Sequence, residues 1–140
     1  MTDILIVASP GGHLKVAEEL FLNTDLKIKF ITTRNNPDQI FKYDAIREFN
    51  RDMNIFRAFY DAFLVIKKNK PKIIVSTGAG VAVPFFILGY LMHKKLIFIE
   101  SISRVKSLSL AGKIVYPFVK KLYVRNIELT YIYKKAEYYG

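Results

Sequence analysis

The chain alternates short apolar strand-like runs with helical segments, and this alternation constrains its fold more than any other feature. Strands are expected at 4–8, 26–32, 45–49, 72–76, 96–100 and 121–124. Helices are expected at 14–23, 54–69, 81–93 and 108–119, whereas 34–43 is loop-like and the tail from Arg125 onward has no clear period. Strands that alternate with helices form mostly parallel sheets with right-handed crossovers. The sequence therefore predicts one α/β domain over residues 1–140, with a Rossmann-like sheet and helices on both of its faces.

The charge of the chain is strongly positive and unevenly placed. The net charge is +10, and residues 71–140 hold 11 Lys/Arg against 3 Asp/Glu, whereas residues 1–70 hold 11 against 9. A basic half indicates a polyanionic partner, either nucleic acid or an anionic membrane surface. No secretory leader is expected at the start. The longest apolar run, 81–92, is shorter than the roughly 20 residues that a spanning helix needs.

Three polar loops are expected to meet at one edge of the sheet. They are 9–13, 77–80 and 100–104, and each follows an expected strand. In parallel sheets ligands bind at the carboxyl ends of the strands, near the point where the strand order reverses. We therefore expect the binding site of this protein among these loops.

The first of these loops reads Ser9-Pro10-Gly11-Gly12-His13. Two glycines before a helix allow backbone N–H groups to approach a ligand, and the helix start favours an anion. A tight turn without a ligand has the same pattern. The loop lacks the third glycine and the acidic residue of a dinucleotide site, and no phosphate-binding Gly-Lys-Ser/Thr motif occurs. Cysteine is absent and only two histidines occur, so neither a metal nor another cofactor is expected.

The second and third loops add candidate ligand groups to the same edge. Thr77, Gly78 and Gly80 open the next helix, either as a second anion cradle or as a packing turn. Glu100 is placed to orient a sugar hydroxyl and Arg104 to bind a phosphate, although the two residues could also pair with each other. His13 is the first candidate for a general base and Glu100 the second.

Aromatic and basic residues alternate in the second half of the chain. This basic aromatic set comprises Tyr116, Phe118, Lys120, Lys121, Tyr123, Arg125, Tyr131, Tyr133, Lys134, Lys135, Tyr138 and Tyr139. Such a combination suits a membrane interface or stacking on RNA. A solvated basic face over ordinary core aromatics is the structural alternative. The helix expected at 54–69 carries a further apolar stripe and ends in Lys67-Lys68.

The stretch 98–117, FIESISRVKSLSLAGKIVYP, resembles the signature of a known family. This family is the membrane-anchor subunit of the two-chain N-acetylglucosaminyltransferase of asparagine-linked glycosylation, with its bacterial capsule and exopolysaccharide relatives. The Gly-Gly-His loop, the stretch 76–84 (STGAGVAVP) and the ending 138–140 (YYG) match as well. The resemblance covers nearly the whole chain.

The resemblance implies the N-terminal, acceptor-side half of a GT-B glycosyltransferase, similar to the acceptor domain of the peptidoglycan enzyme that glycosylates lipid I. It implies that Ser9, Gly11, Gly12, Thr77, Gly78 and Gly80 hold the acceptor diphosphate, and that Glu100 and Arg104 line the cleft. Two features differ from the family pattern. No N-terminal membrane helix is expected, and Val124-Arg125-Asn126 stands where a Gln-Trp pair is usual.

Together these features predict a subunit of a bipartite glycosyltransferase in bacterial surface-polysaccharide biosynthesis. It would bind a polyprenyl-diphosphate-linked acceptor, peripherally at the cytoplasmic face of the cell membrane. A partner subunit would bind the UDP-sugar, and no nucleic acid is expected. Two alternatives remain open at this point: a basic nucleic-acid-binding module and a stand-alone nucleotide-binding domain.

Overall fold

The computed structural model describes residues 2–8, 12–21, 25–32, 43–45, 55–78, 80–101 and 103–139. Its strands are β1 (Ile4–Ala8), β2 (Ile28–Thr32), β3 (Tyr43–Ala45), β4 (Ile73–Gly78), β5 (Lys95–Ile99), β6 (Lys121–Val124) and β7 (Ala136–Tyr138). Its helices are α1 (Gly12–Leu20), α2 (Ile55–Asn69), α3 (Ala82–Leu91), α4 (Leu110–Val115) and α5 (Glu128–Ile132).

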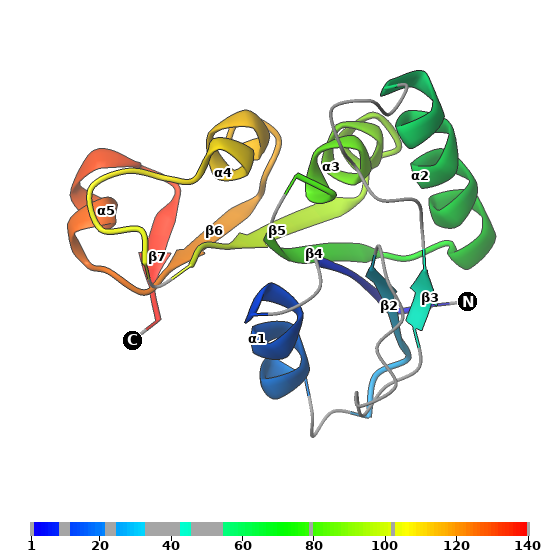
Figure 1. Cartoon of the computed structure of the whole chain (residues 1–140), viewed down its shortest axis with the longest axis horizontal. Coiled ribbons are helices and arrows are strands. Elements are labelled where there is room, and N and C mark those ends of the chain that lie inside the picture. Colours follow the sequence, from blue (N-terminus) through cyan, green and yellow to red (C-terminus); the bar gives the residue numbers. More distant parts are fainter. Residues whose placement is uncertain are drawn as a thin grey trace.

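All these strands join one parallel sheet in the order β3-β2-β1-β4-β5-β6-β7. The chain builds outward from β1 to β2 and β3, then returns to β4 on the other side of β1. The order therefore reverses between β1 and β4, where Ile4 is in register with Ile73. Figure 1 shows α1 on one face of the sheet and α2, α3 and α4 on the other.

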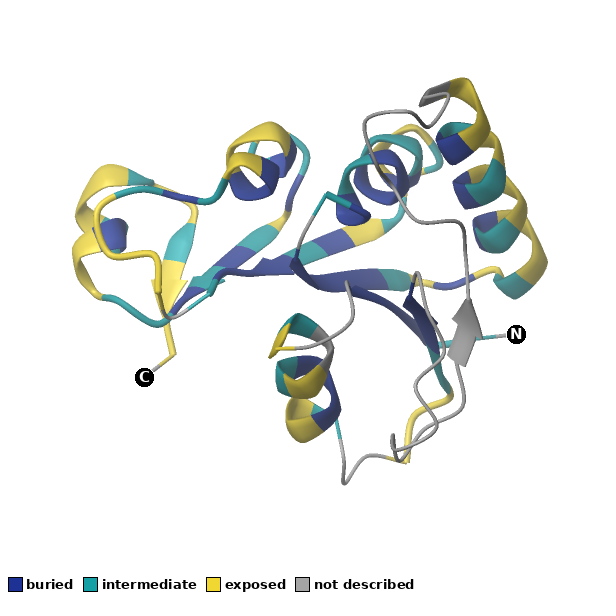
Figure 2. Ribbon diagram, viewed as in Figure 1, coloured by how far each residue is buried: buried dark blue, intermediate teal, exposed yellow. Residues whose placement is uncertain are grey.

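Each face of the sheet carries its own apolar core, because successive strand residues point to opposite faces. Leu5 and Val7 of β1 pack with α2, α3 and α4, while Ile4 and Ile6 pack with Ala17 of α1. The strands at the centre are buried on both faces (Figure 2). Continuous apolar runs such as 4–8 are what a parallel sheet between two helical layers requires.

The predicted fold class is confirmed, and the differences lie in short elements. The third strand is Tyr43–Ala45 rather than 45–49, whose last four positions lie outside the described residues. The tail, for which no period was expected, forms α5 and the edge strand β7. Strands and helices of three to five residues are too short to show a period, and β7 is defined by its pairing with β6.

The described helices include none that is both long and apolar enough to cross a membrane. The most apolar of them, α3, has 10 residues and is wedged between the sheet and its neighbours α2 and α4. Its residues Ala82, Pro84, Phe85, Phe86 and Gly89 are buried.

Candidate functional site

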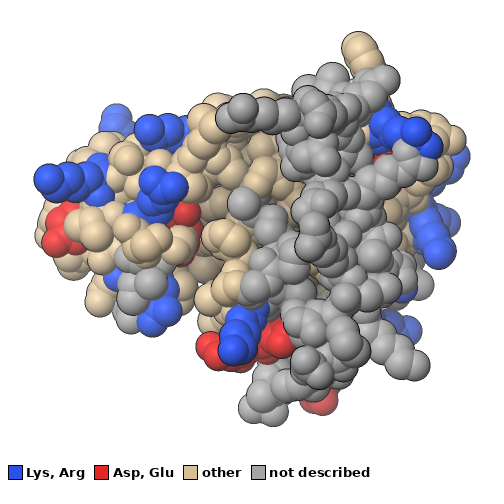
Figure 3. Space-filling view, in the orientation of Figure 1, with Lys and Arg blue, Asp and Glu red and all other residues tan. Residues whose placement is uncertain are grey.

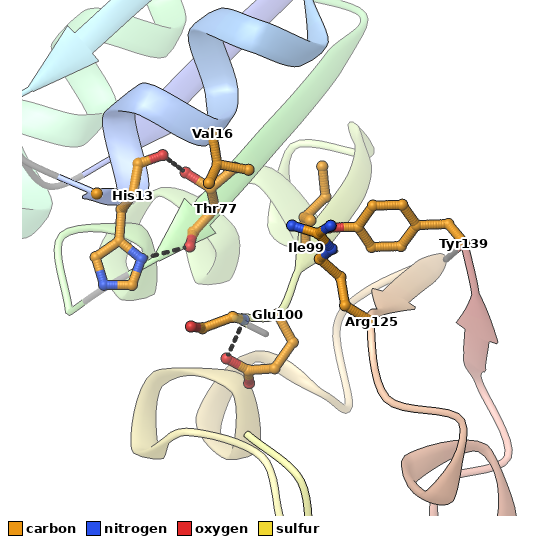
Figure 4. Close-up of a pocket in the computed structure, with 9 residues that line it drawn as sticks. His13, Val16, Thr77, Ile99, Glu100, Arg125 and Tyr139 are labelled. Atoms are coloured by element: carbon orange, nitrogen blue, oxygen red, sulfur yellow. Dashed lines mark hydrogen bonds between the residues drawn. The ribbon is translucent and has the colours of Figure 1, made fainter. Parts of the chain in front are cut away.

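A cavity of about 340 Å³ lies at the carboxyl ends of the strands, beside the point where the strand order reverses. It is lined by Gly12, His13, Val16, Thr77, Ile99, Glu100, Ser101, Arg125 and Tyr139. These residues come from α1 and from the ends of β4, β5, β6 and β7 (Figure 4). The described residues of the three loops selected from the sequence lie at this edge, as expected for a parallel sheet.

Two hydrogen bonds fasten the start of α1 to the end of β4. The Nδ1 atom of His13 donates to the carbonyl oxygen of Thr77 over 2.8 Å, and the Thr77 hydroxyl donates to the carbonyl oxygen of His13. Because a carbonyl oxygen only accepts, Nδ1 carries the ring proton, and Nε2 holds the lone pair of the neutral imidazole. In this tautomer Nε2 is the ring nitrogen that can accept a hydrogen bond or a proton.

Gly78 provides the space in which the His13 ring lies. Its φ angle is +118°, a conformation that side chains rarely adopt, and a Cβ atom there would lie 2.7 Å from Nδ1 of His13. The Gly78 amide donates to the buried Ser76 hydroxyl over 3.1 Å. This glycine is therefore needed for the backbone turn and for the position of the imidazole.

Glu100 is buried, with 3% of its surface exposed, and organises the loop behind the cavity. Its Oε1 accepts from the Ser101 amide, and its Oε2 accepts from both the amide and the hydroxyl of Ser109, at 2.9–3.0 Å. The Ser109 hydroxyl in turn accepts from the Gly112 amide as the N-cap of α4. A Cβ atom on Gly112 would lie 2.5 Å from Oε2. The carboxylate therefore fixes the start of α4 against the end of β5.

Arg125 and Tyr139 form the opposite side of the cavity (Figure 4). The Arg125 Cζ atom lies 5.7 Å from the centroid of the Tyr139 ring, a cation–π distance. Burial raises the pKa of the Tyr139 phenol, and the nearby Arg125 charge opposes that rise. The phenol is therefore neutral at physiological pH and keeps its proton to donate.

The structure brings together four of the residues selected from the sequence: Gly12, His13, Thr77 and Glu100 line the cavity. Gly78 is not among the lining residues but lies against the His13 ring. Gly80 and Arg104 are not among the lining residues, and Arg104 has an exposed side chain.

Ser9 and Gly11 lie outside the described residues. Arg125 and Tyr139 were assigned from the sequence to the basic aromatic set and not to the site. Arg125 comes directly after β6 (Lys121–Val124), just as the three selected loops come after their strands. The rule that ligand groups lie at the carboxyl ends of parallel strands therefore also points to Arg125. Tyr139 had no such signal, because β7 was not expected.

The basic aromatic set divides into internal contacts and exposed residues. Tyr116 packs edge-to-face on Tyr133 at 5.5 Å, and the Lys135 ammonium lies 5.2 Å from the Tyr116 ring. Lys121 pairs with Glu137. Tyr131 and Lys134, by contrast, are exposed. Part of the set therefore stabilises the second half of the domain.

The sequence profile described as "Oligosaccharide biosynthesis protein Alg14 like" matches residues 49–140. The chain is 44% identical over 75 residues to "UDP-N-acetylglucosamine transferase subunit alg14" of Schizosaccharomyces pombe, covering 50% of this chain and 36% of that one. It is 34% identical over 96 residues to the mouse subunit ALG14, covering 62% and 44%. The chain thus spans less than half the length of these curated relatives.

Solved structures match the fold over almost the whole chain. A Staphylococcus aureus MnaA–UDP co-structure superposes with a TM-score of 0.77 at 11% identity, covering 100% of this chain and 45% of that one. Acinetobacter baumannii MurG superposes with a TM-score of 0.67 at 14% identity, covering 87% and 41%. At such identities the likeness establishes the fold, that of the N-terminal domain of GT-B enzymes. The profile match covers well over half of the chain, and the protein therefore belongs to the Alg14 family of oligosaccharide-biosynthesis proteins.

Proposed function

We propose that this chain is the acceptor-side subunit of a two-chain glycosyltransferase that uses a UDP-sugar donor and a polyprenyl-diphosphate-linked acceptor. The cavity at the strand-order reversal, with an oriented imidazole at its edge, is the observation that carries the proposal. Family membership supports the reaction class, since the curated relatives are named as transferase subunits. Those two relatives are eukaryotic, so the bacterial surface-polysaccharide setting remains a prediction. The comparisons lend no support to a nucleic-acid-binding module or a stand-alone nucleotide-binding domain.

His13 is the group proposed to accept a proton in the transfer step. The acceptor hydroxyl attacks the anomeric carbon of the donor sugar, and its proton passes to Nε2 of His13. The bond from the anomeric carbon to the UDP oxygen breaks, and UDP leaves with the electron pair. The hydrogen bond from Nδ1 to Thr77 fixes the tautomer that leaves Nε2 basic. No covalent enzyme intermediate is required.

Glu100 is proposed to position the site rather than to move a proton. Both of its oxygens already accept hydrogen bonds from Ser101 and Ser109. A carboxylate held by three donors has little capacity left for a substrate hydroxyl. Its effect on transfer would arise from the geometry of the β5–α4 loop.

The donor-binding half is proposed to come from a partner subunit. The chain matches 45% of the MnaA structure and 41% of the MurG structure, so each of those proteins has a further half that this domain does not cover. In a GT-B enzyme the cleft lies between two such halves. The cavity edge at His13 and Arg125 would face that partner.

Helix α2 is proposed to dock the protein peripherally on the cytoplasmic face of the membrane. The side of α2 that faces the core carries Ala58, Ala62 and Ile66. Other apolar residues of the same helix form a second stripe on its solvent-facing side. That outward stripe comprises Phe56, Tyr60, Phe63 and Leu64, which are 81%, 61%, 38% and 44% exposed.

Basic residues border this outward stripe. The Lys67 ammonium lies 5.9 Å from the Phe63 ring, and Lys68 follows it in the last turn of α2. Basic side chains lie over α2 and, at the other end of the same view, around α4 and α5 (Figure 3). Aromatic rings bordered by lysines are suited to the headgroup region of an anionic bilayer.

The transferase proposal is tested by reconstituting the chain with a candidate donor-binding partner and a synthetic polyprenyl-diphosphate sugar. Transfer from a UDP-sugar is expected to need both chains and to fall about 100-fold or more in His13→Ala, the range of a positioned base. Gly12→Ala is a second probe, because a Cβ atom there meets no atom within 4 Å. It should leave the fold unchanged and weaken acceptor binding. Unchanged transfer in both variants, with the fold preserved, would refute the assignment of this cavity.

The membrane proposal is tested by sedimentation with anionic phosphatidylglycerol-containing vesicles. The Phe56→Ser/Tyr60→Ser variant is expected to bind roughly 10-fold or more weakly, because two rings lose their burial in the interface. Tyr131→Ser removes a ring that is 79% exposed on α5 and serves as the matched control. A loss of binding in the control but not in the α2 variant would contradict the role of α2.

A further inference from the structure

Arg125 presents a positive charge inside the cavity without a matching negative one. Its side chain is half-buried, and its Nε atom is buried with no hydrogen-bond partner. Within the described parts of the chain, the guanidinium forms no ion pair with a carboxylate. A buried donor without an acceptor is unfavourable, and for a charged group the cost is larger. The guanidinium charge is therefore available to an anionic ligand in the cavity.

Tyr139 holds the guanidinium in place from the side away from His13. The Tyr139 ring contacts Arg125 at 5.7 Å and packs edge-to-face on Tyr123 at 6.2 Å. Its amide donates to the carbonyl oxygen of Val124, the residue before Arg125, over 3.1 Å. Arg125 is therefore held between the ends of β6 and β7, which lowers the entropy that it would lose on binding a ligand.

The start of α1 contributes a second group to the cavity that favours an anion. The first turn of α1, with Gly12 and His13, brings the positive end of a helix to the opposite side. Among the described lining residues, Glu100 is the only carboxylate, and its oxygens accept hydrogen bonds from Ser101 and Ser109. The described lining thus offers donors from two sides and no free carboxylate between them.

We propose that Arg125 and Tyr139 form the phosphate subsite of this cavity, and that they hold a diphosphate ester between themselves and the start of α1. The Nη groups of the Arg125 guanidinium donate to phosphoryl oxygens, and the neutral Tyr139 hydroxyl supplies a further donor. This inference deepens the proposed function, since the same cavity would hold the acceptor. It also transfers the phosphate-binding role from the exposed Arg104 to Arg125.

The direct test is a titration of the ¹⁵N-labelled chain with inorganic pyrophosphate, followed through the arginine Nε–H resonances. The Arg125 signal is expected to shift in a saturable way. In Arg125→Gln, affinity should fall about 10- to 100-fold, the contribution of a hydrogen bond to a charged group. Arg125→Lys keeps the charge but loses the planar fork of guanidinium donors and should recover only part of the affinity.

Two further variants make the result specific to this subsite. Lys113→Gln removes an exposed charge on α4 and should bind pyrophosphate as the unaltered chain does. Tyr139→Phe keeps the ring and removes only the hydroxyl, so a weaker loss is expected. An Arg125 resonance that does not shift, or an equal loss in Lys113→Gln, overturns the proposal. A loss confined to Arg104→Gln would also overturn it.

The source of the diphosphate is resolved by comparing farnesyl diphosphate with UDP in the same titration. The proposed function predicts that the prenyl diphosphate binds more tightly and that its binding depends on Arg125. Tighter binding of UDP, again dependent on Arg125, would support the subsite but contradict the acceptor-side function. Arg125-independent binding of both ligands would overturn the subsite and leave the transferase proposal to its own assay.

Discussion

Ser109 joins the buried carboxylate of Glu100 to the start of α4, and its replacement by alanine tests how the cavity is held in shape. The Ser109 hydroxyl donates to Oε2 of Glu100 over 2.9 Å and accepts from the Gly112 amide over 3.1 Å. Ser109→Ala removes both hydrogen bonds and leaves the Ser109 amide as the one remaining donor to Oε2 among the described residues. The variant therefore loses an N-cap and one of three bonds to a buried charge.

The expected cost follows from these two losses. Removal of a serine N-cap destabilises a protein by about 1 kcal/mol, and a hydrogen bond to a charged group contributes about 1.5–3 kcal/mol. Because the two bonds share one hydroxyl, we expect a total near 3 kcal/mol rather than the upper sum. For a domain of this size that loss lowers Tm by roughly 10 °C.

Urea unfolding followed by circular dichroism measures this cost directly. Ser103→Ala is the matched control, because Ser103 is exposed and, within the described parts of the chain, its hydroxyl bonds to the Ser101 hydroxyl rather than to a buried group. That variant should stay within about 0.5 kcal/mol of the unaltered chain. A loss below about 1 kcal/mol in Ser109→Ala would show that Glu100 does not organise this loop and would return it to the candidates for direct catalysis.

Three smaller predictions concern other parts of the domain. Gly78→Ala should destabilise the fold by about 2 kcal/mol, given the strain of its φ angle, and should break the His13–Thr77 bond, which imidazole ¹⁵N shifts report. Glu18 has a raised pKa, chiefly because burial disfavours its charge. The fold therefore loses stability as pH rises through that raised pKa and the buried carboxyl becomes charged. Glu18→Gln should therefore gain thermal stability over the unaltered chain between pH 4.5 and neutrality, and a constant difference across that range would contradict the assignment. Glu137→Gln breaks an exposed pair with Lys121 and should leave Tm unchanged within error, because water screens such pairs.

The residues that line the cavity could be predicted only where local chain pattern marks them. Glycines before a helix marked Gly12 and His13, and the end of a strand marked Thr77 and Glu100. The position of each loop at the carboxyl edge then followed from parallel pairing alone. What these residues contact did not follow, because hydrogen-bond partners 64 residues apart, such as His13 and Thr77, are set by packing.

The amino-acid sequence by itself determined the class of fold, because buried parallel strands need continuous apolar runs and the crossover helices need amphipathic ones. It also indicated the edge of the sheet where the cavity lies. Only the tertiary structure decided that Glu100 is held by α4, that α2 keeps an apolar side outward, and that Arg125 and Tyr139 complete the cavity. The physical reason is that these features depend on the meeting of distant segments. The edge strand β7, which positions Tyr139, is itself too short to form without its neighbour β6.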